Sequence, residues 1–346
     1  MTALGGMKLT RAYESLSGEG CFPADDDLGV DGYLTTQAKR LASLAGVMQS
    51  FAKAQMLLRD LCGWTLDEET IRLLTHAVAK SASSSRTSRE DATRFGAASG
   101  EIEVAIDAGK VNTRGGWRDV KIALFSRREA GLPATPTEWD SRELPRPTIG
   151  IVVAAIEDAE SFTERVRAES DRLNATLAGA ITVAGDGAEW IWNLAEKVFP
   201  LADEVLDVYH AVEHIGDAVK AVWGDGTDVA RDRLAAGRQA LLTRGKLGVE
   251  RWLADATVEV PATSSTDPLI ALAAYLAKHP TRVDYAERLA EGRSIGSGAV
   301  EGAVKQLINL RLKRTGARWA VKHVGPLVEL IALSETPEWA ALWTAA

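Results

Sequence analysis

The feature that most constrains this fold is a series of short apolar segments in the middle of the chain. In residues 101–107 and 119–129, apolar and polar side chains alternate as they do along a half-buried strand. Residues 148–156 form a nearly continuous β-branched run, which is typical of a buried strand. Two further strand patterns, at 180–187 and 204–210, alternate with helical patterns. This order predicts a mixed α/β sheet covered by helices.

Helical patterns come before this sheet segment. Residues 34–62 carry apolar side chains three and four positions apart, and a second helical pattern follows Gly63 and covers residues 66–80. A helix, a glycine turn and a second helix fit a DNA-reading helix-turn-helix, but any helical hairpin with such a turn has the same pattern. The polar, Ser-rich residues 81–99 read as a linker.

We therefore divide the chain into five parts. They are an irregular lead-in at 1–33, a helical region with its linker at 34–99, the sheet segment at 100–210, an all-helical segment at 211–292 and C-terminal helices at 293–346. Within the last part, helices are expected at 299–314 and 322–333.

The charge of the chain is segregated along the sequence. The formal net charge is -8, which by itself argues against a nucleic-acid binder. Residues 305–322, however, contain no acid, so they form either a phosphate-contacting surface or a solvated helix face. Their cations are Lys305, Arg311, Lys313, Arg314, Arg318 and Lys322.

Composition also bears on the cellular compartment. No uncharged apolar run approaches the roughly 20 residues that span a bilayer, and the N-terminus lacks a signal-peptide pattern. The two cysteines, Cys21 and Cys62, form neither a disulfide framework nor a metal-type cluster. We expect a cytoplasmic protein without a membrane partner.

Three acidic residues stand at positions where chemistry is often found. Asp107 and Asp186 each follow an apolar strand pattern, and Glu301 lies in the first turn of a predicted helix. Each also has an ordinary structural explanation: an Asp-Gly or Asp-Ala-Gly turn for the aspartates, and the helix dipole for Glu301. Together they would suit two Mg²⁺ or Mn²⁺ ions, which prefer carboxylate oxygens and catalyse phosphodiester chemistry.

Three sequence blocks strengthen this interpretation. Residues 104–125 (VAIDAGKVNTRGGWRDVKIALF), 183–215 and 294–319 (SIGSGAVEGAVKQLINLRLKRTGARW) resemble, in order, the catalytic blocks of the ISKra-type insertion-sequence transposases, relatives of the Mutator-like group. The resemblance covers roughly residues 25–335. It implies an RNase H-like catalytic core with an all-α insertion between the second and third blocks. The chain would then be a DDE transposase that cleaves and joins DNA with two Mg²⁺ or Mn²⁺ ions.

The resemblance also assigns individual residues. Asp107, Asp186 and Glu301 match the DDE triad. Asp207 and His210 match a C/D-x-x-H motif near the second acid, where His210 either positions a phosphate or carboxylate or is a core histidine. Phosphate contacts are implied for Lys305, Arg311, Lys313, Arg314 and Arg318.

The implied partners are double-stranded DNA, as element ends and as target, and further copies of the chain in a homo-oligomer. One departure from the family is the lack of a Cys-x-x-Cys element before the helical lead-in, which puts recognition of element ends in doubt. The alternative to an active enzyme is therefore a truncated, catalytically silent transposase that binds DNA. An unrelated small-molecule α/β enzyme is disfavoured because the chain lacks a nucleotide-binding glycine fingerprint.

Overall fold

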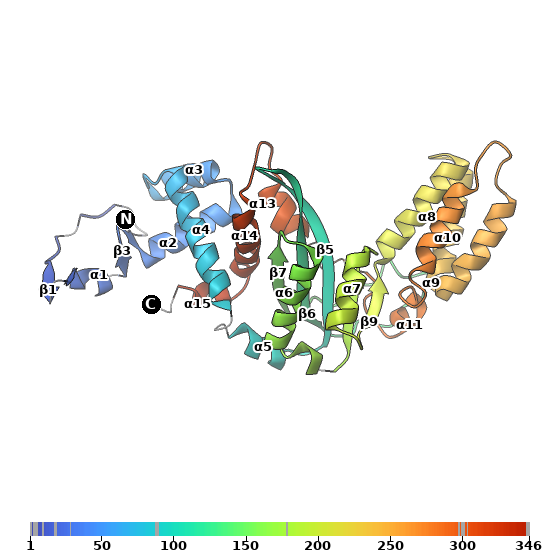
Figure 1. The fold of residues 1–346 in the computed structure, drawn as a ribbon, viewed down its shortest axis with the longest axis horizontal. Coiled ribbons are helices and arrows are strands. Elements are labelled where there is room, and N and C mark those ends of the chain that lie inside the picture. Colours follow the sequence, from blue (N-terminus) through green and yellow to red (C-terminus); the bar gives the residue numbers. More distant parts are fainter. Residues whose placement is uncertain are drawn as a thin grey trace.

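The computed structural model describes residues 2, 6–8, 10–16, 19–27, 29–86, 90–177, 179–296, 298, 302 and 304–343. Its centre is a mixed five-stranded sheet with the order β7-β6-β5-β8-β9 (Figure 1). Within this sheet, β6 pairs antiparallel with both β5 and β7, and β8 and β9 run parallel to β5. The predicted mixed α/β class is confirmed. The strands are β5 Glu101–Thr113, β6 Gly116–Arg128, β7 Ile149–Ala155, β8 Ile181–Gly185 and β9 Asp203–Leu206.

Helices cover both faces of this sheet. On one face, Val104 and Ile106 of β5 belong to a buried cluster that includes side chains of α6 (Ala159–Arg172) and α7 (Glu189–Val198). On the other face, Ala105 and Val111 belong to a cluster with α4 (Glu68–Ser84) and α14 (Val321–Ser334). The alternation of β5 residues between the two clusters is the period-two pattern of a strand that is buried on both sides.

The N-terminal helices differ from the expected pattern at two points. Residues 34–62 are not one helix, because α2 (Thr36–Met48) ends before Ser50, whose hydroxyl caps α3 (Phe51–Cys62) by accepting from Lys53 N. Gly63, with φ 64°, ends α3 in the left-handed region, and α4 follows. The predicted linker at 81–99 is partly wrong, since α4 continues to Ser84 and α5 occupies Asp91–Ala97.

The expected irregular lead-in also contains regular structure. Two small antiparallel hairpins and a short helix precede α2. They are β1 Glu14–Leu16 with β2 Glu19–Cys21, α1 Pro23–Asp27, and β3 Val30–Asp31 with β4 Leu34–Thr35.

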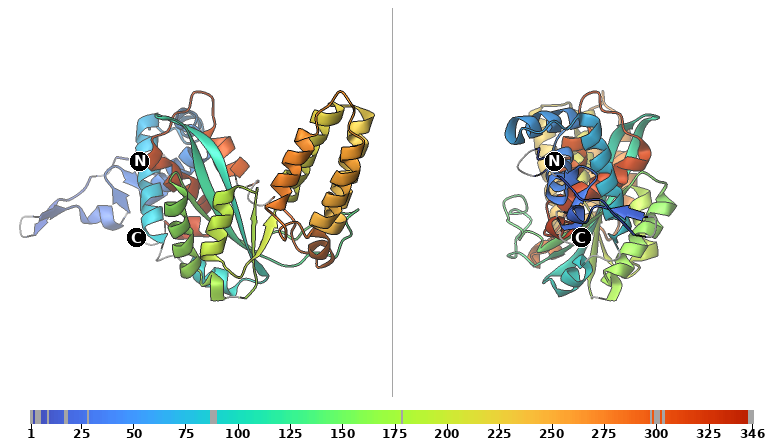
Figure 2. Two further views of the ribbon diagram at one scale, coloured as in Figure 1. Left: turned by 45° about the vertical axis from the view of Figure 1, so that its right-hand side comes forward. Right: turned by 90° about the vertical axis from the view of Figure 1, so that its left-hand side faces the viewer.

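A helical arm follows the last strand of the sheet. Figures 1 and 2 show α8, α9 and α10 projecting side by side from the β9 edge, away from the N-terminal helices. The helices of the arm are separated at Gly224, after α8, and again between α9 and α10. The arm consists of α8 Val208–Trp223, α9 Asp228–Val258, which is kinked at Arg244 and Gly245, α10 Asp267–Ala277 and α11 Tyr285–Ala290.

The C-terminal part returns to the sheet. A π-helix, Val304–Asn309, passes into the short α13 (Leu310–Leu312), then α14 and α15 (Glu338–Ala341) follow. A 3-10 turn at Ala175–Leu177 completes the described elements. No helix within the described ranges combines the length and the hydrophobicity needed to cross a bilayer.

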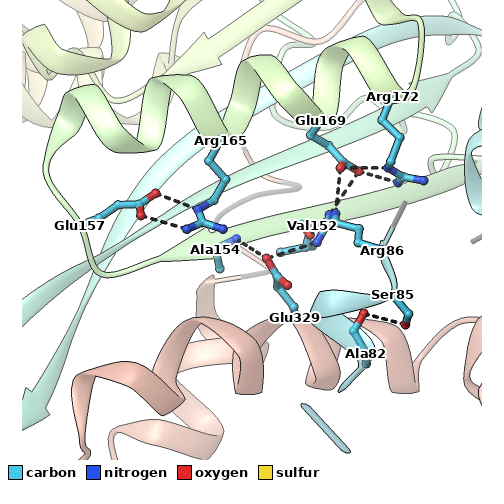
Figure 3. A network of polar contacts seen from close by, with 10 residues as sticks. All are labelled: Ala82, Ser85, Arg86, Val152, Ala154, Glu157, Arg165, Glu169, Arg172 and Glu329. Atoms are coloured by element: carbon cyan, nitrogen blue, oxygen red, sulfur yellow. Dashed lines mark hydrogen bonds and ion pairs between the residues drawn. The ribbon is translucent and has the colours of Figure 1, made fainter. Parts of the chain in front are cut away.

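A buried polar network holds the helices against β7 (Figure 3). Arg86, just after α4, donates from Nε to Glu169 Oε2 at 2.8 Å and from Nη2 to Val152 O at 2.6 Å. Its Nη1 also lies 3.2 Å from Glu329 Oε1 of α14. Glu169 and Glu329 are 4% and 6% exposed, so one arginine joins α6, β7 and α14 inside the protein.

Candidate active site

Three aspartates follow in register on three neighbouring parallel strands. Gly185, the last residue of β8, pairs with Ile106 of β5 on one side and with Leu206 of β9 on the other. Asp107, Asp186 and Asp207 are the next residues on these strands. Because adjacent strands lie about 4.8 Å apart, the three residues begin one acidic row across the sheet. We call Asp107, Asp186 and Asp207 the aspartate row.

Asp107 does not close its strand, so that part of the sequence prediction is wrong. β5 continues to Thr113 because β6 pairs with it along its whole length, from Glu101–Arg128 to Thr113–Gly116. Its other neighbour, β8, stops at Gly185. Asp107 therefore lies where the parallel pairing ends, level with Asp186, although its own strand goes on.

Asp186 begins a tight turn beside α10. Its Oδ1 accepts from Ala188 N at 2.9 Å, and Gly187 adopts φ +98°, a conformation that favours glycine. The hydroxyl of Tyr275 donates to Asp186 O at 3.3 Å. Burial raises the pKa of Tyr275, and the charges of Asp186 and Asp207 raise it further. Tyr275 therefore stays a neutral donor at this turn.

Asp107 is half-buried, and the helix after position 301 covers the strand beside it. Its Oδ1 accepts from its neighbour Ala108 N at 2.6 Å. Two residues on, and on the same side of β5, a Cβ at Gly109 would lie 2.7 Å from Ile308 Cδ1 and 3.2 Å from Val304 Cγ1. Only glycine lets the π-helix approach β5 this closely.

Asp207 has a clear structural task. It is fully buried, its backbone N donates to Gly185 O at 2.8 Å, and its Oδ1 accepts from Tyr209 N at 2.7 Å and His210 N at 3.1 Å. The side chain is thus the N-cap of α8. His210 is half-buried in the first turn, with Nδ1 3.6 Å from Glu213 Oε2. Asp207 thus follows β9 directly, and His210 lies in the first turn of α8.

The segment that leads to Glu301 is anchored beside the aspartate row. Ser294 Oγ donates to Glu103 Oε1 at 2.6 Å, and Ile295 O accepts from Val208 N at 3.1 Å. A Cβ at Gly296 would lie 3.0 Å from Asp207 Oδ2. Glu301 itself lies outside the described residues.

Arginines of the α11 region hold this anchor in place. The buried Arg288 donates from Nε to Ser294 O at 2.7 Å, from Nη2 to Thr182 Oγ1 at 3.1 Å, and pairs with Asp203 through Nη1. Arg293 Nη1 lies 2.9 Å from Asp203 Oδ2. Thr182 and Asp203 are paired residues of β8 and β9, four positions before Asp186 and Asp207. The contacts therefore fix residues 288–296 on the face of β8 and β9 that leads to the aspartate row.

The donor chemistry of the aspartate row suits a hard divalent cation. Carboxylate oxygens are the ligands that Mg²⁺ and Mn²⁺ prefer, and Asp107 and Asp186 supply them from adjacent strands. Asp207 commits its Oδ1 to the α8 cap. Among the described residues, no three His, Cys, Asp or Glu side chains form a group that could hold a metal ion. Glu301, the third acid that the sequence analysis expects here, lies outside that part.

The predicted phosphate-contacting residues gather further along β5, near the β5–β6 turn. Arg311 is buried: Nε and Nη2 donate to Gly46 O at 3.1 and 2.8 Å, and its guanidinium lies between the rings of Phe51 and Trp319 at 4.8 and 5.1 Å from their centroids. Burial lowers the pKa of Arg311 to about 10. Its described hydrogen bonds are therefore structural.

The other cations of this segment differ in exposure. Arg314 is half-buried, with Nη2 3.4 Å from Gln49 Oε1, while Lys313 and Arg318 are exposed. The side chain of Lys305 lies outside the described part of the chain. Sequence reasoning missed Arg72 and Arg114, which come from α4 and the β5–β6 turn and lie beside this group. It also missed Tyr275, because nothing in a single sequence shows that α10 reaches the turn at Asp186.

The comparisons with known proteins leave the site to be interpreted from its own geometry. No protein-family model matches the sequence, and no curated protein matches it either.

Proposed function

We propose that this chain is a DDE-type transposase with an RNase H-like core, which cleaves and joins DNA strands at carboxylate-bound Mg²⁺ or Mn²⁺. One observation carries the proposal: Asp107 and Asp186, chosen from sequence blocks 79 positions apart, each directly follow a residue of the last registered pair of β5 and β8, Ile106 and Gly185. A chance pair of surface aspartates has no reason to meet in this way. The sequence resemblance supplies the family, and the register supports its catalytic pair.

The sheet gives further support. An antiparallel unit of β5, β6 and β7 is extended on the β5 side by two parallel strands, which places β5 at the centre. A core of the RNase H type requires acids on its central first strand and beside it. The helical arm starts within the second resembling block, and α9, α10 and α11 lie between the second and third blocks, where the proposed all-α insertion is expected.

In this proposal, Asp107 and Asp186 hold the ions, and Glu301 completes the ligand set. The ions would supply activation of the attacking oxygen and charge stabilisation of the leaving oxygen. Asp207 caps α8 through its side chain, and its backbone N donates to Gly185 O of β8. Its role in the aspartate row is therefore to hold the end of β9 beside β8. Tyr275 restrains the Asp186–Gly187 turn by its hydrogen bond to Asp186 O.

The test joins an activity with a binding measurement. DNA that carries the sequences flanking the coding region is incubated with the protein and Mg²⁺ or Mn²⁺, and nicking and strand transfer are scored. Isothermal titration with Mn²⁺ is run on the same samples. We expect Asp107→Asn, Asp186→Asn and Glu301→Gln to abolish cleavage and weaken Mn²⁺ binding. Asp217→Asn, an exposed position on α8, is the matched control and should change neither.

The outcomes separate the candidate functions. Full Mn²⁺ binding and unchanged cleavage in Asp186→Asn would refute the proposed site. A second candidate is a silent transposase that only binds DNA, and the basic side chains near the β5–β6 turn favour it. If the unaltered protein binds DNA but neither cleaves it nor binds Mn²⁺, this second candidate is favoured. Sedimentation with and without DNA tests the proposed homo-oligomer.

A further inference from the structure

A cationic pocket of about 570 Å³ lies at the β5–β6 turn. Its walls come from α3, α4, the turn itself and the segment 311–323. No Asp or Glu is among the described residues that line it. Its charged and titratable lining consists of Arg72, Arg114, Arg311, Arg314, Arg318 and Lys322, with His76 and His323. We call this the basic pocket.

The basic pocket is built by specific backbone contacts. Trp319 N donates to Asn112 O at 3.0 Å, and Arg114 N donates to Trp319 O at 2.9 Å, which joins the segment 313–320 to the end of β5. The indole of Trp319 donates to Leu312 O at 3.0 Å. Arg311 donates to Gly46 O, which joins the same segment to α2. These bonds hold the lining segments of the pocket in place.

Two buried donors in the basic pocket lack an acceptor. Arg72 Nη1 lies 3.2 Å from His76 Nδ1, and since a guanidinium can only donate, Nδ1 must accept and the proton must sit on Nε2. His76 Nε2 is buried and has no hydrogen-bond partner among the described atoms, and the same holds for Arg314 Nε. An unmet buried donor costs about 1–3 kcal/mol, so both are expected to have a partner in the functional state.

The histidines are held neutral in the ligand-free pocket. His76 and His323 stack with ring centroids 4.0 Å apart and an interplanar angle of 13°. Burial, then the charges of His323, Arg72 and Arg311, lowers the pKa of His76 to about 4, against a small opposing effect of Glu69. Glu69 also pairs with Arg72, with Oε2 2.7 Å from Nε, on the outer side of α4. An added anion would reverse the cationic influence on His76.

We propose that the basic pocket binds a backbone phosphate of a nucleic-acid strand. A phosphate offers several acceptor oxygens to the exposed cations Arg318 and Lys322, no acid of the lining competes for them, and the volume admits a phosphate with its sugar. The identity of the strand rests on the proposed function. Arg311 takes part as a buried positive floor, and Arg72 and Arg114 join the contact surface.

The distance from the basic pocket to Asp107 gives the spacing of the two phosphates for a duplex that lies along β5. Arg114 follows Asp107 by seven residues along an extended strand, since 114 − 107 = 7. At about 3.3 Å per residue the two are roughly 23 Å apart. With a rise of about 3.4 Å per base pair, a duplex lying along β5 would contact the pocket about seven base pairs from the reacting phosphate.

The test measures binding without chemistry. Asp107→Asn/Asp186→Asn protein in EDTA is titrated with a fluorescent 30-base-pair duplex over a range of salt concentrations. Adding Arg318→Gln/Lys322→Gln, both exposed, should weaken binding several-fold at low salt and reduce the slope of log K against log salt by about 1.8, or about 0.9 per lost contact. The control, Lys220→Gln/Arg251→Gln, removes two exposed cations of the arm and should leave the slope unchanged. Equal slopes for the two double substitutions would overturn the proposal.

A second measurement reports on the pocket directly. The imidazole NMR signals of His76 and His323, assigned with His76→Gln, are titrated with pH in the presence of inorganic phosphate, 5′-dAMP or the duplex. We expect the duplex to raise the pKa of His76 above about 4 at concentrations where the small phosphates have no effect. Saturation by inorganic phosphate or 5′-dAMP at equal concentration would instead make a free phosphate the ligand and overturn the nucleic-acid assignment. These results stay valid if cleavage and Mn²⁺ binding fail, so the two proposals fall separately.

Discussion

Asp207 is the member of the aspartate row whose side chain caps a helix. We predict that Asp207→Ala destabilises the fold by about 2–4 kcal/mol. The change removes the acceptor of two N–H groups, at 2.7 and 3.1 Å, from a fully buried helix start. Loss of an N-cap costs about 0.5–2 kcal/mol, and each buried N–H that water cannot reach adds about 1–3 kcal/mol when unmet. The first turn of α8 can relax partly after the change, so the predicted loss of about 2–4 kcal/mol lies below the full sum of these separate costs.

Asp207→Asn is the matched variant, because an amide oxygen caps a helix about as well as a carboxylate oxygen. It should cost about 1 kcal/mol or less and leave Mn²⁺ binding unchanged. Urea and thermal unfolding measure both variants, and the alanine change should lower the Tm by about 3–6 °C. If Asp207→Asn kept its stability but lost Mn²⁺ affinity as Asp186→Asn does, the carboxylate would be a metal ligand and the cap would not be its main task.

Three further predictions test the surrounding structure. Arg86→Met should cost about 3–5 kcal/mol in urea unfolding, because it leaves the buried Glu169 and Glu329 without their shared partner; a loss below 1 kcal/mol would contradict the importance of the network. Gly109→Ala should cost about 1–3 kcal/mol and reduce cleavage more than DNA binding, since the new Cβ would meet Ile308 at 2.7 Å; unchanged cleavage rates would show that the π-helix can move away freely. Because the folded-state pKa of His76 is about 4, below its unfolded value near 6.5, its contribution to stability is present above pH 6.5 and is lost as the pH falls toward 4. Unfolding at pH 7.5 and pH 5 should therefore show a loss of about 1–2 kcal/mol that His76→Gln removes; an identical loss in both proteins would place the proton elsewhere.

The strands of the sheet could be predicted from the sequence because local patterns carry that information. Period-two alternation predicted β5 and β6, and the β-branched run predicted β7, since each reflects which side chains face a core. The length of β5 was underestimated because Asp107, Lys110 and Asn112 interrupt the apolar pattern, while pairing with β6 keeps the backbone extended. Tertiary pairing here outweighs local composition.

The tasks of individual charged residues could not be predicted in the same way. Arg311 looks like its neighbours Lys313 and Arg314 in the sequence, yet it is buried because Gly46, Phe51 and Trp319 surround it. Gly46 is 265 positions away along the chain, and no pattern within residues 305–322 signals that contact. Arg86 is similar: it lies in a polar, Ser-rich stretch that reads as a linker, but its partners are acids on α6 and α14.

The long strand β5 connects the two proposed sites. β8 supports it only as far as Ile106, where the aspartate row begins. Beyond that point β6 remains its partner on one edge, while the π-helix, through Ile308, and Trp319, through Thr113, contact the rest of it. The part of β5 that has no β8 partner therefore runs from the acids to the basic pocket, and the segment after Glu301 packs along it. In the proposed transposase, this one strand would therefore set the distance between the reacting phosphate and the phosphate held in the basic pocket.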